Sequence, residues 1–79
     1  MKEFKIGIVG GAGYIGSTLA NSLSETFKVK ILDVNPLPRK LEHKVEYQKC
    51  DITEYEEVRQ GLEDEDLVIH TAIVQIPLI

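Results

Sequence analysis

Cysteine and histidine are scarce in this 79-residue chain, which has one cysteine and two histidines. Cys50 has no partner cysteine, so an internal disulfide is excluded, and we expect it to be a small residue at a strand end. His43 and His70 lie far apart in the sequence and, with one cysteine, give no metal-ligand spacing. A disulfide-stabilised module and a cysteine–histidine metal centre are therefore both ruled out.

The chain also lacks a basic excess and a long apolar run. Nine Lys and Arg residues against 13 Asp and Glu residues give a net charge of −4, which disfavours nucleic acid as a partner. No stretch reaches the roughly 20 apolar residues that a membrane span requires. Five glycines interrupt the apolar residues that follow Lys5, unlike the apolar region of a signal peptide. The cytoplasm is the expected compartment, with no membrane partner.

What the chain does have is a glycine-rich turn near its start. The apolar run Phe4 to Val9 predicts a strand covered on both faces, and a helix is expected from Tyr14 to about Glu25. Two overlapping patterns fit the turn between them: Gly11-x-Gly13-x-x-Gly16 and Gly10-x-x-Gly13-x-x-Gly16. Either pattern allows a tight turn, close approach of a pyrophosphate to the backbone, and close packing of the helix on its strand.

The start of this helix is the expected phosphate site. Its free N–H groups and the positive end of the helix dipole would face the anion. Within the helix, Ile15, Leu19 and Leu23 recur every four residues and predict the side that packs on a sheet. The side expected to face water carries Ser17, Asn21 and Ser24.

A second strand, Phe27 to Asp33, ends in a carboxylate about 20 residues after the glycines, the spacing of a dinucleotide site. There Asp33 would accept hydrogen bonds from the adenosine ribose and repel a 2′-phosphate, which favours NAD over NADP. The alternative is that Asp33 only forms a turn before Asn35-Pro36. Arg39 and Lys40 are either solvated loop charges or the basis of an NADP site.

The second half of the chain predicts two further strands and a helix. Pro36 to Lys44 is too short for a full crossover helix and is expected to be a loop with one turn. A strand is expected over Lys44 to Cys50, with Val45 and Tyr47 on one face. A fourth strand is expected from Asp66 to about Val74. We expect its core to be Leu67, Val68 and Ile69, with His70 a packed structural residue rather than a catalytic base.

The helix between these strands has a predicted N-terminus. Thr53-Glu54-Tyr55-Glu56 fits a capping box, in which Thr53 caps the helix and Glu56 bonds back to the amide of the cap residue. The helix is expected to run to about Leu62. Three of its side chains are expected to face inward: Tyr55, Val58 and Leu62.

Four stretches resemble the extended short-chain dehydrogenase/reductase family, most closely its NAD-dependent nucleotide-sugar epimerases and dehydratases. They are Gly10-Gly11-Ala12-Gly13-Tyr14-Ile15-Gly16-Ser17, Ile31-Leu32-Asp33, Cys50-Asp51-Ile52-Thr53 and Val68-Ile69-His70-Thr71-Ala72. The resemblance covers nearly the whole chain. Two departures are Val9, where the family usually has Thr, and Thr71 with Ile73, in a segment that usually reads Leu-Ala-Ala.

The resemblance implies a set of residues that contact NAD. Asp51 and Ile52 would hold the adenine, although Asp51 has the alternative role of starting the helix after it. Thr71, Ala72 and Ile73 would lie beside the pyrophosphate and the nicotinamide ribose. The remaining expected contacts are Gly10, Gly13, Tyr14, Ile15, Gly16, Asp33 and Asn35.

The predicted fold is α/β: a partial Rossmann, or doubly wound, parallel sheet of four strands in the order 3-2-1-4 with two helices. We expect residues 1–79 to be a truncated NAD-binding half-domain. The family's catalytic Tyr-x-x-x-Lys is absent from the sequence, because Thr18, Asp51 and Arg59 lie four residues after the three tyrosines. No catalytic residue is therefore predicted, and a parent acting on a sugar, an amino acid or a steroid would share this beginning.

Two functions remain open. The chain is either the NAD-binding N-terminal part of an epimerase or dehydratase, or a stand-alone module that binds nucleotides or dimerises without catalysis. In both cases the fourth strand would be a sheet edge with unpaired backbone groups. Such edges recruit partners, which predicts self-association, as a homodimer or aggregate, along Leu67 to Ile79.

Overall fold

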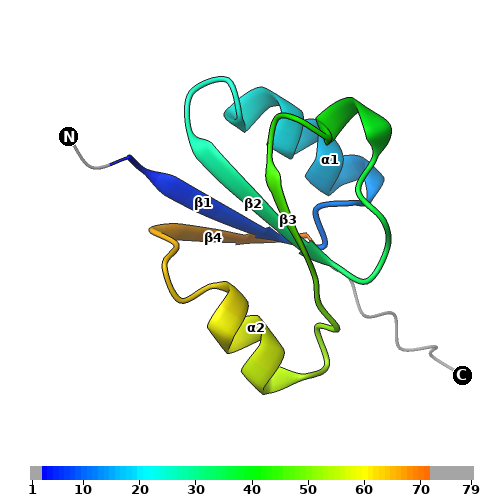
Figure 1. Ribbon diagram of the computed structural model, residues 1–79, viewed down its shortest axis with the longest axis vertical. Coiled ribbons are helices and arrows are strands. Elements are labelled where there is room, and N and C mark those ends of the chain that lie inside the picture. The colour runs from blue at the N-terminus through cyan, green and yellow to red at the C-terminus, as the bar shows by residue number, and fades with distance from the viewer. Residues whose placement is uncertain (1–2, 72–79) are drawn as a thin grey trace, which may run out of the picture.

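The computed structural model, which describes residues 3–71, contains one parallel sheet with helices on both of its faces (Figure 1). The four strands are β1 (Lys5–Val9), β2 (Lys28–Asp33), β3 (Glu46–Lys49) and β4 (Leu67–His70), in the spatial order β3-β2-β1-β4. The helical segments are α1 (Tyr14–Leu23), the 3₁₀ turn η1 (Arg39–Leu41) and α2 (Tyr55–Gly61). This confirms the predicted class and strand order.

The apolar core lies between the sheet and α1. Because side chains alternate along parallel strands that are in register, Ile8 of β1 lies beside Ile31 of β2 and Ile69 of β4 on one face. Full burial of an aliphatic side chain of this size stabilises a fold by about 1.5–3 kcal/mol. The buried members of this core are Ile6, Ile8, Ala20, Val29, Ile31 and Leu41.

The side of α1 that faces the sheet agrees with the prediction at Leu19 and Leu23, which pack against the core cluster, but not at Ile15 and Ser17. Ile15 is 60% exposed, whereas Ser17, predicted to face water, is only 5% exposed. The cause is the close approach of the helix to the preceding turn, which places its small residues, Gly16, Ser17 and Ala20, against the sheet. The Ser17 hydroxyl is satisfied within the helix, where it donates to the Tyr14 carbonyl over 3.2 Å.

The opposite face of the sheet is partly polar and carries α2. A Cβ added to Gly61 would lie 2.5 Å from Cδ2 of Leu32, and one added to Gly7 would lie 2.8 Å from Cδ2 of Leu62. These two glycines therefore allow the end of α2 to pack directly on β1 and β2. The Lys30 ammonium donates to the Gly61 carbonyl over 3.0 Å, which satisfies an acceptor at the C-terminus of α2.

The predicted capping box is wrong. Glu54 is the N-cap residue of α2, and its side chain makes no capping bond within residues 3–71. The Thr53 hydroxyl donates instead to Oδ1 of Asp51 over 2.7 Å, while Glu56 accepts from Arg59 over 2.9 Å. Tyr55 is 74% exposed and not inward-facing, because the short helix contacts the sheet through its last turn.

The outer edge of the sheet is β4, which pairs only with β1 within residues 3–71. Leu67 and Val68 are 46% and 44% exposed, so the prediction that they are buried core is wrong. An edge strand has one neighbour to cover it, and only Ile69 packs against the core cluster. His70 is exposed as well, contrary to the expectation of a packed residue. None of the helices within residues 3–71 is long and apolar enough to cross a membrane.

Candidate functional site

The turn between β1 and α1 depends on the backbone conformation of Gly10. Its φ of 82° lies in the left-handed region, which side-chain-bearing residues rarely adopt, and no other described residue has a positive φ. The Gly10 amide donates to the Leu32 carbonyl over 2.7 Å, and its carbonyl accepts from Gly13 over 3.3 Å. Gly10 therefore reverses the chain at the carboxyl ends of the strands.

Gly11 and Gly16 are required by packing within the protein. A Cβ on Gly16 would lie 2.6 Å from the Gly11 Cα, 2.7 Å from the Gly10 carbonyl oxygen and 2.8 Å from Oγ1 of Thr71. A Cβ on Gly11 would lie 2.7 Å from Cγ1 of Ile31. These two positions explain how α1 begins in direct contact with the turn.

Gly13 is different, because nothing within residues 3–71 requires it to be glycine. Its φ of −74° and ψ of 177° are open to any residue, and it is exposed. An added Cβ would have only Gly10 as a neighbour, with the carbonyl oxygen at an ordinary 3.6 Å. Its missing side chain leaves space outside the turn that no described residue fills.

That space adjoins the N-terminus of α1. The first helical hydrogen bond runs from the Ser17 amide to the Gly13 carbonyl over 2.8 Å. The N–H groups of Tyr14, Ile15 and Gly16 make no hydrogen bond to any group within residues 3–71. Tyr14 and Ile15 are 88% and 60% exposed, so the start of the helix is open to a ligand.

Asp33 joins the end of β2 to the glycine turn. Its carboxylate is buried at 7% exposure, with Oδ2 accepting from the Ala12 amide and Oδ1 from the Asn35 amide, each over 3.0 Å. The bond to Asn35 is the turn predicted as the alternative role. The bond to Ala12, 21 residues away, shows that Asp33 also lies beside the glycines. Each carboxylate oxygen has a second lone-pair direction with which it could accept from a ligand.

Tyr47, predicted only to share a face of its strand with Val45, completes this region. The Tyr47 hydroxyl lies 2.6 Å from the Asn35 carbonyl oxygen and 3.1 Å from that of Asp33, and donates its single hydrogen to this pair. Burial, and then the charge of Asp33, raise the pKa of the Tyr47 phenol. Tyr47 lies directly beside Ile31 on β3, two residues short of Asp33 in register, and the sequence alone does not give this register.

The predicted adenine contacts have local roles in the structure. Asp51 is exposed, and its Oδ1 accepts from the Thr53 amide and hydroxyl over 2.9 and 2.7 Å. The Thr53 hydroxyl, followed by its amide, holds the pKa of Asp51 below its usual value. Asp51 thus forms the turn before α2, the alternative noted for it, and Ile52 beside it is half-buried.

Thr71 reaches the glycine turn from β4. Its hydroxyl lies 3.0 Å from each of the carbonyl oxygens of Val9 and Gly10, to which it donates. Ala72 and Ile73, predicted beside it, lie outside the described residues. Cys50 is a buried free thiol whose pKa is raised, chiefly by burial, which fits the structural role expected for it.

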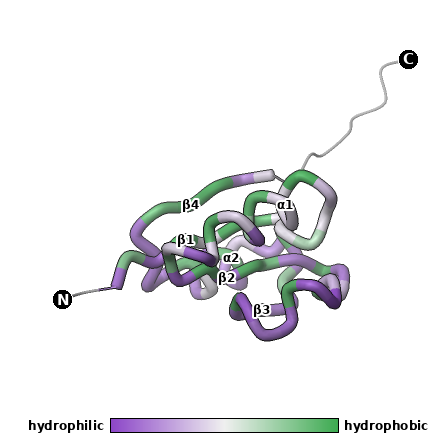
Figure 2. The backbone as a smooth tube through the Cα atoms, turned by 90° about the horizontal axis from the view of Figure 1, so that it is seen from above, coloured by the Kyte–Doolittle hydropathy of each residue, from purple (hydrophilic) through white to green (hydrophobic). Residues whose placement is uncertain are grey.

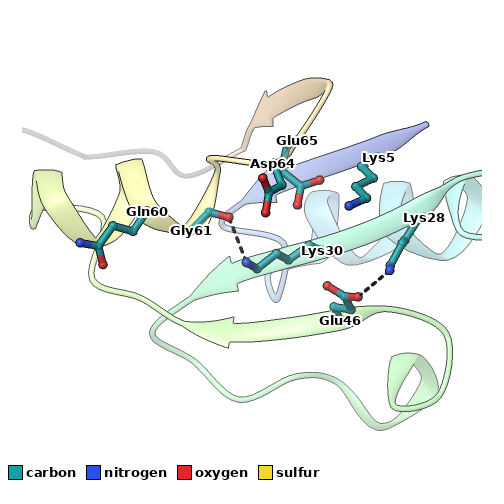
Figure 3. A pocket seen from close by; sticks show the side chains of 8 residues that line it. All are labelled: Lys5, Lys28, Lys30, Glu46, Gln60, Gly61, Asp64 and Glu65. Atoms are coloured by element: carbon teal, nitrogen blue, oxygen red, sulfur yellow. Dashed lines mark hydrogen bonds and ion pairs between the residues drawn. The ribbon is translucent and has the colours of Figure 1, made fainter. Parts of the chain in front are cut away.

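A concave site of about 110 Å³ lies apart from the glycine turn, on the α2 face near the beginnings of the strands (Figure 3). Lys28 pairs with Glu46 over 3.1 Å, and one oxygen of Glu65 is buried without a hydrogen-bond partner among the residues that the structure describes. Burial raises the pKa of Glu65. The positive charges of the three lysines that line this site balance the negative charges of its three acidic residues, so the site has no net attraction for phosphate. It includes none of the predicted cofactor contacts, being lined by Lys5, Lys28, Lys30, Glu46, Gln60, Gly61, Asp64 and Glu65.

Comparison with known proteins supports the resemblance seen in the sequence. The model of the 3-beta hydroxysteroid dehydrogenase/isomerase family matches residues 7–77. The chain belongs to this family. It is thereby an extended short-chain dehydrogenase/reductase, as the glycine turn predicted, and it matches the N-terminal segment of such epimerase- and dehydrogenase-like proteins.

Individual members of the family, and solved structures that superpose on this chain, support the family membership. A vaccinia virus 3 beta-hydroxysteroid dehydrogenase/Delta 5→4-isomerase is 31% identical over 71 residues, which cover 82% of this chain and 20% of the viral protein. A UDP-galactose 4-epimerase superposes with a TM-score of 0.75 at 29% identity, over 91% of this chain and 25% of the epimerase. A short-chain dehydrogenase from Leptospira borgpetersenii with bound NAD+ superposes with a TM-score of 0.74 at 29% identity. The superposition covers 96% of this chain and 34% of the dehydrogenase.

These coverages limit what the family membership says about this chain. The 79 residues span about a fifth of the length of the curated relatives they match. The family relationship therefore applies to the sheet, the glycine turn and Asp33. It does not extend to whatever in the relatives lies beyond the matched segment.

Proposed function

We propose that this chain binds NAD through the adenosine diphosphate portion of the cofactor. The pyrophosphate would lie over Gly13 against the amides that begin α1, and the adenosine ribose would bond to Asp33. Asn35 and Thr71 would border the bound cofactor, and Asp51 and Ile52 would lie toward its adenine. Support comes from the relatives, since the Leptospira dehydrogenase has NAD+ bound.

The observation that carries this proposal is the unexplained glycine at position 13. Gly10, Gly11 and Gly16 have reasons to be glycine inside the protein, namely a positive φ or a contact below 3 Å. Gly13 has neither, and it stands beside amides that have no partner within residues 3–71, at the positive end of a ten-residue helix. A phosphate that must approach the backbone closely supplies the missing reason.

The proposed role is that of a cofactor-binding segment without catalysis of its own. In a complete enzyme the nicotinamide would accept a hydride from a substrate carbon, and a tyrosine–lysine pair would move the proton. This chain has no such pair. The substrate of that enzyme is proposed only as a class, an alcohol carbon of a steroid or of a nucleotide sugar, because both kinds of relative share this segment.

Titration with NAD+ tests the proposal. We expect a Kd on the order of 10⁻⁴–10⁻³ M, because only about half of the usual cofactor contacts are present. Gly13→Ala should weaken binding at least tenfold, since its Cβ would occupy the space of the pyrophosphate. Isothermal titration calorimetry, or the ¹⁵N chemical shifts of residues 10–17, would measure the Kd of the wild type and of the variant.

The stability of Gly13→Ala separates the ligand from the fold. The free energy of unfolding in urea should stay within about 1 kcal/mol of the wild type, because the loss of a good N-cap residue offsets the gain in chain stiffness. Ser22→Ala, on the exposed side of α1, is the matched control and should change neither quantity. The proposal would be wrong if the wild-type protein showed no change in the ¹⁵N chemical shifts of residues 10–17 at about 10 mM NAD+, a concentration above the expected Kd.

We also propose that the chain self-associates through the edge of β4. Figure 2 shows this edge strand as mainly hydrophobic, and Leu67 and Val68 are the exposed apolar side chains on it. Paired with a second copy, the free backbone groups of β4 would be satisfied.

The cytoplasm stays the proposed compartment, since its reducing conditions suit the single thiol of Cys50.

Sedimentation velocity at high micromolar concentration should show a dimer or larger species. Val68→Lys should shift the protein toward monomer, because a charge at this position opposes close pairing of two apolar edges. Val34→Lys changes a similarly exposed apolar residue away from β4 and should leave the association as it was. A wild type that sediments only as monomer contradicts this part of the proposal.

A further inference from the structure

The Tyr47 side chain bonds to the backbone of the turn that begins at Asp33. Its hydroxyl lies 2.6 Å from the carbonyl oxygen of Asn35, a short and hence well-formed hydrogen bond, and 3.1 Å from that of Asp33. The phenol therefore spans the turn that follows β2 and contacts the residues on both sides of Val34. No other described side chain bonds to these two carbonyls.

The bonds of the Asp33 carboxylate depend on that turn. Oδ1 accepts from the amide of Asn35, the residue whose carbonyl Tyr47 holds. Oδ2 accepts from Ala12 in the glycine turn. The main chain of Asp33 is held separately, because its carbonyl also accepts from the Cys50 amide over 3.0 Å. Of these contacts, only the Tyr47 hydroxyl restrains Asn35 from β3.

We propose that Tyr47 is a positioning residue for Asp33 and thereby sets the preference of the site for a ribose with a free 2′-hydroxyl over one with a 2′-phosphate. The inference rests on the proposed binding of NAD. A carboxylate accepts a ribose hydroxyl only at the right distance and angle, and a supporting shell of hydrogen bonds provides that precision. A loosened turn would cost NAD+ its hydrogen bonds and would relieve the repulsion of NADP+.

The test compares NAD+ and NADP+ affinities of the wild-type 79-residue chain and of Tyr47→Phe. The substitution removes the hydroxyl and retains the ring that packs beside the core cluster. We expect NAD+ affinity to fall threefold to tenfold, with NADP+ affinity unchanged or slightly raised, so that the ratio of the two falls. Partial unfolding would lower both affinities equally and leave that ratio unchanged.

Two further measurements complete the test. Tyr55→Phe, which changes an exposed tyrosine outside this network, should keep the wild-type ratio. In an Asp33→Asn background, Tyr47→Phe should no longer alter the ratio, because the group that it positions has lost its charge. Equal losses for both cofactors, or an unchanged ratio in Tyr47→Phe, would overturn the positioning role. A wild type that binds neither cofactor would instead refute the proposed function.

Discussion

Gly16→Ala should destabilise this protein by about 2 kcal/mol, within the roughly 1–3 kcal/mol that is usual for overpacking a core. The new methyl group would lie 2.6 Å from the Gly11 Cα and 2.7 Å from the Gly10 carbonyl oxygen, both backbone atoms that move only with the turn. Alanine's better helix propensity returns about 1 kcal/mol at most. The midpoint of urea unfolding should fall by about 2 M, because a small domain loses about 1 kcal/mol per molar urea.

Gly13→Ala is the matched control, since it adds the same methyl group three residues earlier, where the nearest neighbour is 3.6 Å away. The two variants should differ by about 2 kcal/mol in unfolding free energy. Equal midpoints would show that the turn gives way at Gly16 without cost. The claim that α1 is held by direct contact between its backbone and the glycine turn would then be wrong.

The strand order and the glycine turn were predictable because local patterns specify them. Apolar runs that end in glycine or aspartate define the ends of β1 and β2, and the spacing of Asp33 identifies the parallel crossover between them. The burial of the small residues of α1 was not predictable from its large side chains. The helix approaches through Gly16 and Ala20, and a pattern of apolar residues gives small residues little weight.

The predictions of a capping box and of a buried fourth strand were wrong because each depends on groups outside the segment from which it was made. Thr53 fits a capping box, but the Asp51 carboxylate two residues earlier takes both its amide and its hydroxyl. Leu67 and Val68 read as core because they are apolar, and whether a strand is covered depends on its neighbours in the sheet. The contacts of Tyr47 join residues 12 and 14 positions apart, which no periodicity indicates.

Asp33→Ala should damage both the fold and the proposed site. The carboxylate accepts hydrogen bonds from the amides of Ala12 and Asn35, and its loss leaves both donors without that acceptor. Because Asp33 is buried and charged acceptors give the stronger bonds, we expect a loss of about 2–3 kcal/mol in urea unfolding. NAD+ affinity should fall more than tenfold, since the ribose loses its acceptor and the glycine turn loses its tie to β2.

Asp33→Asn distinguishes these two consequences. The amide oxygen still accepts one of the two backbone bonds, while the NH₂ group opposes the other donor, so stability should lie between those of the wild type and Asp33→Ala. The charge is gone, so repulsion of a 2′-phosphate disappears and NADP+ should bind about as well as NAD+. A variant that retains the full wild-type preference for NAD+ would mean that Asp33 serves only the turn before Asn35. Ligand selection would then have to reside elsewhere at the carboxyl edge of the sheet.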